Sequence, residues 1–186
     1  MRNSTLKPDS KVVGTDQTAL DFWQWGFSDI LTNNLRGVFA EFLVGTALGC
    51  LDQPRVEWDS FDLVYQDKKI EVKSSAYIQA WHKDRYSNIS FTIGAKKEYD
   101  YVTNTYSATA KRSADLYVFC LLKEKDTNEV NPLNTAHWEF YVVSTKELDL
   151  HFPHQKTISL ASLQRIAKPY SYDGIKGAVM LLDCEL

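Results

Sequence analysis

The feature that most constrains the fold is an unbroken run of apolar residues from Leu116 to Leu122. Its sequence, LYVFCLL, carries no charge anywhere along its length. A strand with one face in water alternates apolar and polar residues, whereas a continuous run is typical of a strand covered on both faces. A second run, Trp138–Ser144 (WEFYVVS), is also interpreted as a strand. These runs predict a central sheet with material packed on its two sides.

Further elements surround these two strands. Helix-forming patterns and alternating apolar patterns, each bounded by capping or turn residues, predict two helices and three further strands. The helices are expected at Thr32–Gly49 and Ser159–Lys168, and the strands at Phe61–Gln66, Ile70–Ser75 and Ser90–Gly94. Residues 16–31 form a short helix or a packed turn. This order predicts a mixed α/β domain.

Length and composition limit the class of protein. A chain of 186 residues with 44% hydrophobic content fits one domain, here residues 16–186 after a loose lead-in at 1–15. Cys50, Cys120 and Cys184 lie too far apart for a zinc motif and are odd in number, which predicts reduced thiols in a cytoplasmic protein. No apolar segment approaches the roughly 18 residues of a membrane span, so no membrane association is expected.

Charge is distributed unevenly along the chain. The net charge is −3, but the stretch 68–112 holds nine basic and four acidic residues, so it carries +5 while the remainder carries −8. Phosphate binding needs a local positive field and not a positive total. The stretch is therefore interpreted either as a nucleic-acid contact or as ordinary solvated surface.

The strands at 61–66 and 70–75 are expected to form a hairpin around an Asp67-Lys68 turn. This pairing places Asp62 opposite Lys73. Because alternate residues of a strand share a face, one face presents a charged row and the other an apolar row. The charged row is Asp62, Glu71, Lys73 and Ser75, and the apolar row is Phe61, Leu63, Ile70 and Val72.

Two carboxylates beside an ammonium group suggest a cation site. Mg²⁺ prefers oxygen ligands and keeps several waters, so Asp62, Glu71 and the backbone carbonyl of Val72 suffice as protein ligands. Lys73 then reaches a bound water or a phosphate oxygen. The alternative is a surface hairpin with an ordinary Asp–Lys cross-strand pair.

Glu41 lies in the predicted helix among small and apolar neighbours, namely Gly37, Val38, Val44, Gly45 and Leu48. A buried carboxylate needs a partner, which is a metal, a metal-bound water or a basic side chain. The alternative is a purely structural pair with Arg36 or a buried lysine. The two glycines are expected to let this helix approach the sheet closely.

A helix Glu, a strand Asp and a Glu-x-Lys on the next strand resemble the PD-(D/E)xK superfamily of nucleases. Glu41, Asp62, Glu71 and Lys73 match in order and approximate spacing. Asp59 competes with Asp62, and Phe61 stands where many members have proline. The resemblance implies a restriction-endonuclease-like mixed central β-sheet flanked by α-helices, with Glu41 among the metal ligands. It also implies Mg²⁺ as cofactor, with Mn²⁺ able to substitute, and an auxiliary catalytic role for Gln79.

Basic and aromatic residues that could contact nucleic acid lie near this motif. The candidates are Arg36, Ser75, Trp81, Lys83, Arg85, Lys96 and Lys97. Tyr99, Tyr101 and Tyr106 form a tyrosine-rich stretch that is either a DNA-facing loop or an amphipathic surface.

The leading prediction is a Mg²⁺-dependent nuclease that hydrolyses DNA phosphodiester bonds, of restriction or repair type. The alternatives are a DNA-binding module on a nuclease-like scaffold and a structural protein with incidental hairpin charges. DNA is the expected partner, and a homodimer is possible because such nucleases often cut both strands. No Gly-rich phosphate-binding loop occurs in the sequence, so no nucleotide cofactor is expected.

Overall fold

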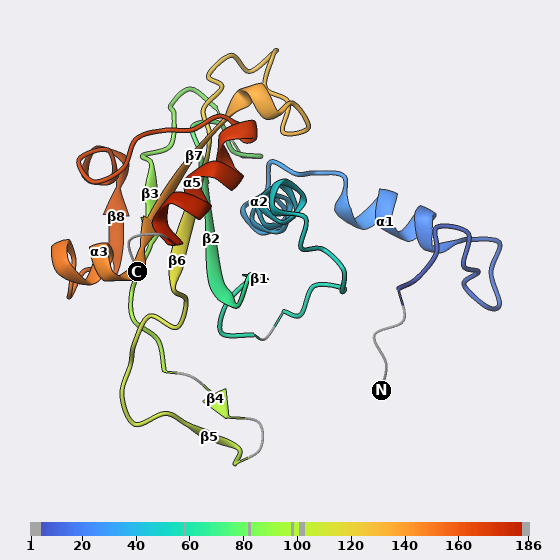
Figure 1. The fold of residues 1–186 in the computed structure, drawn as a ribbon. Coiled ribbons are helices and arrows are strands. Elements are labelled where there is room, and N and C mark those ends of the chain that lie inside the picture. Colours follow the sequence, from blue (N-terminus) through green and yellow to red (C-terminus); the bar gives the residue numbers. More distant parts are fainter. Residues whose placement is uncertain (1–4, 58, 82, 98, 101–102, 184–186) are drawn as a thin grey trace.

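A computed structural model describes residues 5–57, 59–81, 83–97, 99–100 and 103–183; Tyr101 and Cys184 fall outside them. The centre is a four-stranded sheet in the order β1-β2-β6-β7 (Figure 1). The parallel pair β2–β6 lies between two antiparallel pairs, so the sheet is mixed. The strands are β1 (Leu63–Tyr65), β2 (Lys68–Ala76), β6 (Leu116–Leu122) and β7 (Trp138–Ser144).

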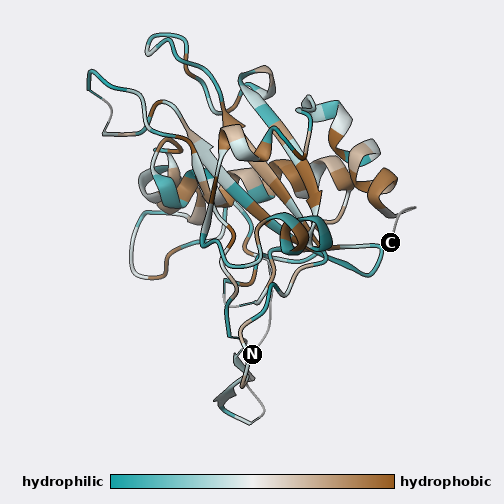
Figure 2. Cartoon of the chain, turned by 90° about the vertical axis from the view of Figure 1, so that its left-hand side faces the viewer, coloured by the Kyte–Doolittle hydropathy of each residue, from teal (hydrophilic) through white to brown (hydrophobic). Residues whose placement is uncertain are grey.

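The central strand β6 has the bounds that its apolar run predicts, and all seven of its residues are buried. Its even-numbered residues face one layer and its odd-numbered residues face the other. The prediction of a mixed α/β domain around a central sheet is therefore confirmed. Figure 2 shows hydrophobic residues concentrated in the sheet and in the elements packed on it.

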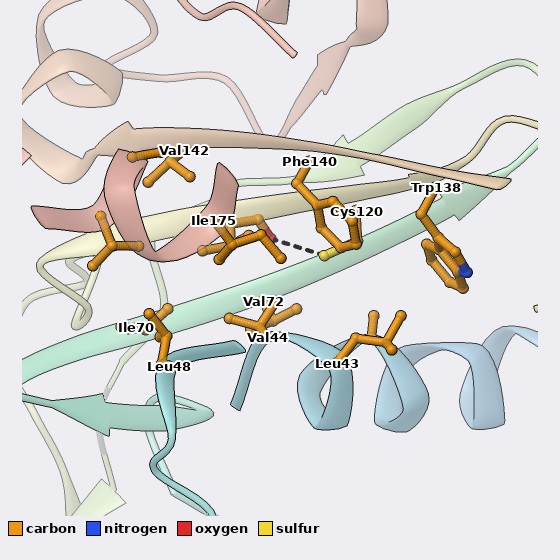
Figure 3. Close-up of a cluster of buried hydrophobic side chains, with 14 of the residues drawn as sticks. Leu43, Val44, Leu48, Ile70, Val72, Cys120, Trp138, Phe140, Val142 and Ile175 are labelled. Atoms are coloured by element: carbon orange, nitrogen blue, oxygen red, sulfur yellow. Dashed lines mark hydrogen bonds between the residues drawn. The ribbon is translucent and has the colours of Figure 1, made fainter. Parts of the chain in front are cut away.

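Two helices cover one face of the sheet, α2 (Asn33–Leu48) and α5 (Ile175–Asp183). Leu43, Val44 and Leu48 of α2 meet Ile70 and Val72 of β2 in this layer (Figure 3). Gly49 ends α2 with a left-handed φ of 72°, a conformation that glycine adopts without a steric penalty. This end of the helix agrees with the prediction.

Gly37 and Gly45 are the two glycines of α2 at which the sequence predicts a close approach to the sheet. A Cβ added there would come within 2.3 Å of the Leu51 side chain and 3.4 Å of Leu63 in β1. The added Cβ would overlap Leu51 of the loop after α2 and only touch the sheet at Leu63, so the expected close approach to the sheet is not decided at Gly45. The expectation is wrong at Gly37, where an added Cβ would meet nothing within 4 Å.

The opposite face is covered mainly by a two-stranded ribbon, β3 (Ser90–Thr92) with β8 (Thr157–Ser159). The helices α3 (Thr145–His151) and α4 (Leu160–Leu163) join this layer through Leu148, Leu160 and Leu163. The helix predicted at Ser159–Lys168 is too long. Ser159 ends β8 and caps α4 by accepting a hydrogen bond from the Ser162 N–H.

Smaller elements complete the chain. The helix α1 (Ala19–Phe27) begins with a capping box between Thr18 and Asp21 and lies apart from the sheet, on the far side of α2 (Figure 1). The others are β4 (Tyr99–Asp100), β5 (Thr105–Tyr106), η1 (Thr135–His137) and η2 (Tyr172–Gly174). No helix within the described ranges is long and apolar enough to cross a membrane.

Candidate active site

The β1–β2 hairpin turns at Gln66-Asp67, whose φ angles are 49° and 62°. Leu63 pairs with Ile70 and Tyr65 with Lys68, so the predicted turn at Asp67-Lys68 is wrong by one residue. Moving a hairpin turn by one residue shifts the pairing by two, which leaves every side chain on its predicted face. Continued by one pair, the observed register brings Asp62 beside Glu71 rather than beside Lys73.

Asp62 lies just before β1, where the edge of β2 becomes open. The Asp62 N–H donates to the Ile70 carbonyl at 2.9 Å, and the Val72 N–H donates to Asp62 Oδ2 at 2.7 Å. The N–H and C=O groups of one strand residue point the same way. The Val72 carbonyl therefore faces the same open edge as the Asp62 carboxylate.

The pKa of Asp62 shows that this corner disfavours the ionised form of its carboxyl group. Burial, followed by the charges of Glu71 and Glu41, raises the pKa of Asp62 to about 6, against the opposing effects of the Val72 N–H and Lys73. Where the ionised form of a carboxyl group is disfavoured in this way, a bound cation stabilises it.

Glu71 projects from β2 and is only 7% exposed. Its Oε1 atom contacts the Lys73 ammonium, and Lys96 Nζ lies 3.5 Å from the same oxygen. Asp62, Glu71 and Lys73 are referred to below as the floor of the site. The structure thus brings together the acidic and basic residues predicted on the hairpin.

Tyr117 was not anticipated from the sequence, although it lines the same cavity. It pairs with Glu71 across the parallel strands β2 and β6. Burial, followed by the charge of Glu71, raises the pKa of its hydroxyl, so Tyr117 stays protonated and able to donate a hydrogen bond. The signal available was its odd-numbered position in the central strand, which places it on the face of Glu71.

Glu41 reaches the site from α2, but a basic residue already holds it. Arg55 donates from Nε and Nη2 to the two carboxylate oxygens at 2.5 and 3.0 Å. The suggested structural partner Arg36 is wrong, because its guanidinium contacts Gln79, Asn33 and the Leu31 carbonyl instead. Arg55 comes from a loop without periodicity, so no pattern in the sequence pointed to it.

The oxygens that could hold a metal are therefore those of Asp62, Glu71 and the Val72 carbonyl. Across the described part of the chain, no group of three or more His, Cys, Asp or Glu side chains is arranged to hold a metal ion. Two carboxylates and one carbonyl still fit Mg²⁺, which takes its remaining ligands from water.

The floor opens into a cavity of about 830 Å³. Acidic groups gather at its base, and basic and tyrosine side chains form a wall that comes from later in the chain. The residues of this wall include Lys96, Lys97, Tyr99, Tyr106, Lys111 and Arg112. Asp59, the competing candidate for the strand Asp, also lines the cavity, but Asp62 alone of the two bonds to β2.

The wall belongs to a projecting segment, residues 94–112, referred to below as the arm. Figure 1 shows it extending beyond the sheet with β4 and β5 at its outer end. Lys96 and Lys111 exchange backbone hydrogen bonds of 2.9 and 3.0 Å at its base. Arg112 fastens that base, since it donates to the Ile93 and Phe152 carbonyls at 2.7 Å and pairs with Asp149.

The predicted nucleic-acid contacts divide into three groups. Lys96 and Lys97 line the cavity. Trp81, Lys83 and Arg85 line a second cavity of about 320 Å³ together with Gln79. Arg36 and Ser75 are only 3% and 7% exposed, so the structure does not present them on a surface for nucleic acid.

Gln79 lies away from the floor. Its Oε1 atom accepts from Arg36, and its Nε2 atom donates to the Ala76 carbonyl at 3.1 Å. The arrangement explains how the buried Arg36 is held without a carboxylate, and desolvation lowers the pKa of that guanidinium to about 10. The auxiliary catalytic role predicted for Gln79 has no counterpart among these contacts.

A family model described as bacteriophage T4 endonuclease IV matches residues 1–162, which include the floor, the arm and both cavities. The chain belongs to this family. Membership in the T4 endonuclease IV family identifies a nuclease, and hence an enzyme. A search of curated proteins finds no match to this endonuclease IV family member.

Proposed function

We propose that this chain is a Mg²⁺-dependent endonuclease that hydrolyses DNA phosphodiester bonds at the floor of the cavity. The observation that carries the proposal is the position of Asp62 beside β2, where it accepts from the Val72 N–H next to Glu71, in a cavity that also holds Lys73 and a basic wall. Family membership supports nuclease chemistry. Glu41 on helix α2, followed by Asp62 and Glu71-x-Lys73 at a mixed sheet, supports a PD-(D/E)xK, restriction-endonuclease-like assignment.

The residues present fit the metal. The raised pKa of Asp62 reflects burial and, after it, the neighbouring carboxylates Glu71 and Glu41, and a divalent ion would offset both effects on the ionised carboxylate. We assign Asp62, Glu71 and the Val72 carbonyl as its ligands, with Mn²⁺ as a substitute for Mg²⁺. A bound ion of this kind polarises the scissile phosphate and activates water.

The chain's own groups prepare the site for the substrate. Lys73 sits against Glu71, from where its ammonium can donate to a phosphate oxygen. Lys96 adds a second positive charge at the same carboxylate. Arg55 fixes Glu41 at the side of the site, so Glu41 contributes negative charge near Asp62 and acts as a ligand only if Arg55 releases it.

One observation favours a second candidate, a DNA-binding module without cleavage. Both Glu41 and Glu71 are already paired with basic side chains, which is an arrangement that needs no metal. A restriction or a repair role, a cytoplasmic location and a homodimer all stay predictions from the sequence.

Cleavage assays separate the two candidates. Supercoiled plasmid and circular single-stranded DNA are incubated with the full chain in Mg²⁺, in Mn²⁺ and in EDTA. We expect cleavage only with metal, and loss of at least about 100-fold in rate for Lys73→Ala. Lys176→Ala, an exposed lysine on α5, is the matched control. Gel shifts without any cleavage in Mg²⁺ or Mn²⁺ would favour the binding module.

A further inference from the structure

The arm carries two tyrosines that the proposed hydrolysis does not use. Tyr99 and Tyr106 are directly paired across β4 and β5. Their ring centroids lie 5.0 Å apart with the planes inclined at 61°, an edge-to-face arrangement. The Tyr99 hydroxyl bonds to the side chain of Asn104 in the turn that joins the two strands. The pair is therefore held in a defined geometry.

Both tyrosines belong to the lining of the cavity that contains the floor. Tyr99 and Tyr106 line it together with Asp62 and Glu71. Tyr106 is 67% exposed, although it is a large aromatic side chain on a two-residue strand. A ring that served only to build a core would be covered, so the open face of Tyr106 is available to a ligand.

The charges around the pair define the ligand. Lys96, Lys97 and Lys111 line the same cavity as the tyrosines and the carboxylates. Lysines bind the phosphates of a nucleic-acid strand, and aromatic rings beside them stack on its bases. A strand with one phosphate at the floor has its neighbouring bases free to turn toward the arm.

We propose that Tyr99 and Tyr106 form a nucleobase-stacking subsite for an unpaired base that flanks the phosphodiester at the floor. Tyr106 presents its ring face to the base, and Tyr99 sets the inclination of that ring. The inference rests on the proposed function only in taking a nucleic-acid strand as the ligand. Stacking needs no base-edge contacts, so the subsite accepts any base with an open face.

Binding without cleavage tests the subsite. The full chain is titrated in EDTA against a short fluorescein-labelled oligothymidylate, and the Kd is read from fluorescence anisotropy. Tyr106→Ala is expected to raise the Kd about tenfold, because stacking on one base contributes roughly that factor. Tyr106→Phe keeps the ring and should bind like wild type. Trp25→Ala, an 85% exposed aromatic on α1, is the control and should also bind like wild type.

A strand of the same length with abasic sites supplies the second arm of the test. Wild type should bind the abasic strand as weakly as Tyr106→Ala binds the oligothymidylate. Tyr106→Ala should bind the two strands with the same affinity. Tyr106→Leu keeps an apolar contact to Tyr99 but has no ring face, so it should bind like Tyr106→Ala. Wild-type affinity in Tyr106→Leu or Tyr106→Ala, or an equal loss on both strands, would overturn the subsite.

The same variants distinguish failure of the subsite from failure of the proposed hydrolysis. Base-dependent binding without cleavage in Mg²⁺ or Mn²⁺ supports the subsite and rejects the hydrolysis. Cleavage in Mg²⁺ together with wild-type binding by Tyr106→Ala rejects the subsite and leaves the hydrolysis in place.

Discussion

Glu71 and Lys73 project from β2 of the central sheet and Asp62 lies beside them just before β1, whereas Lys96, Tyr99 and Tyr106 project from an arm outside the sheet. The floor rests on a strand whose apolar face is buried against α2. The described contacts that attach the arm include the backbone bridge between Lys96 and Lys111, the bonds of Arg112 and the contact of Lys96 with Glu71. Both regions nevertheless face one cavity.

This difference indicates that the floor and the arm have separate roles, chemistry and binding. Reactive groups need positions fixed to within about half an ångström, which packed strands provide. A strand of nucleic acid varies in shape, and a segment on the surface can follow it. We therefore expect substitutions on the floor to change the chemical step and substitutions on the arm to change binding.

The largest expected effect tests this division directly. Asp62→Asn should reduce Mg²⁺-dependent cleavage by about 10³-fold, because loss of a metal ligand removes several kcal/mol of stabilisation of the transition state. Binding of oligonucleotide in EDTA should change little. Cleavage rates under single-turnover conditions measure the effect, with Asp173→Asn in η2 as control. Cleavage by Asp62→Asn at the wild-type rate would mean that Asp62 is not a metal ligand.

The second prediction concerns stability against pH in EDTA. The folded-state pKa of Asp62 is about 6 and its ordinary value is 3.8. Between these values the folded state binds the proton more tightly, so this group's stabilisation is complete below about pH 4 and is lost as pH rises through 6. The loss approaches about 3 kcal/mol of unfolding free energy.

Urea unfolding of wild type and Asp62→Asn at pH 4, 5, 6 and 7 measures this linkage. The difference between the two proteins isolates Asp62 from other titrating groups. Asn at this position should make the metal-free protein more stable than wild type at pH 7, a trade of stability against activity. Parallel pH profiles for the two proteins would contradict the raised pKa of Asp62.

A third prediction asks whether Glu41 belongs with the floor. Arg55→Met leaves the Glu41 carboxylate without its partner, so the protein should lose stability. Arg55 is 38% exposed and Glu41 12% exposed, so we expect about 1–2 kcal/mol rather than the 3–5 kcal/mol of a fully buried pair. Thermal unfolding measures the loss, and adding Glu41→Gln should restore most of it. Restoration by Mg²⁺ instead would mean that the freed Glu41 joins the metal site.

The smallest expected effect lies on the arm. Lys96→Ala should weaken binding of an oligonucleotide a few-fold and lower the slope of log K against log salt by about 0.7–0.9. The slope changes because one fewer phosphate is neutralised. Anisotropy titrations at several salt concentrations measure it, with Lys176→Ala as control. An unchanged slope would mean that Lys96 does not neutralise a phosphate of the oligonucleotide and only pairs with Glu71.

Much of the floor could be predicted from the sequence because alternation along a strand is a local property. The faces of Asp62, Glu71 and Lys73 survive an error in the turn, since the error moved the pairing by two residues. The turn itself was missed because Gln66 takes a left-handed φ of 49°, which glutamine rarely adopts.

The rest depended on contacts between distant segments. Nothing local in the sequence joins Arg55 to Glu41 or Arg36 to Gln79. Other misses had usable signals. Ser144 is followed three residues later by Glu147, the pattern of a capping box, and Ser144 does cap α3. The apolar spacing over Ile175–Asp183 is likewise helical, and α5 forms there.

The attachment of Arg112 makes the outer hairpin replaceable. The Arg112 guanidinium holds the base of the arm against Ile93, Asp149 and Phe152. The part of the arm beyond Lys96 and Lys111 can therefore change in length or sequence without moving the carboxylates of the floor. Exchange of this one hairpin between related enzymes would therefore change which nucleic acid they bind. A chimaera joined at Lys96 and Lys111 should bind the nucleic acid that the donor of the hairpin prefers and cleave it with the floor of the host.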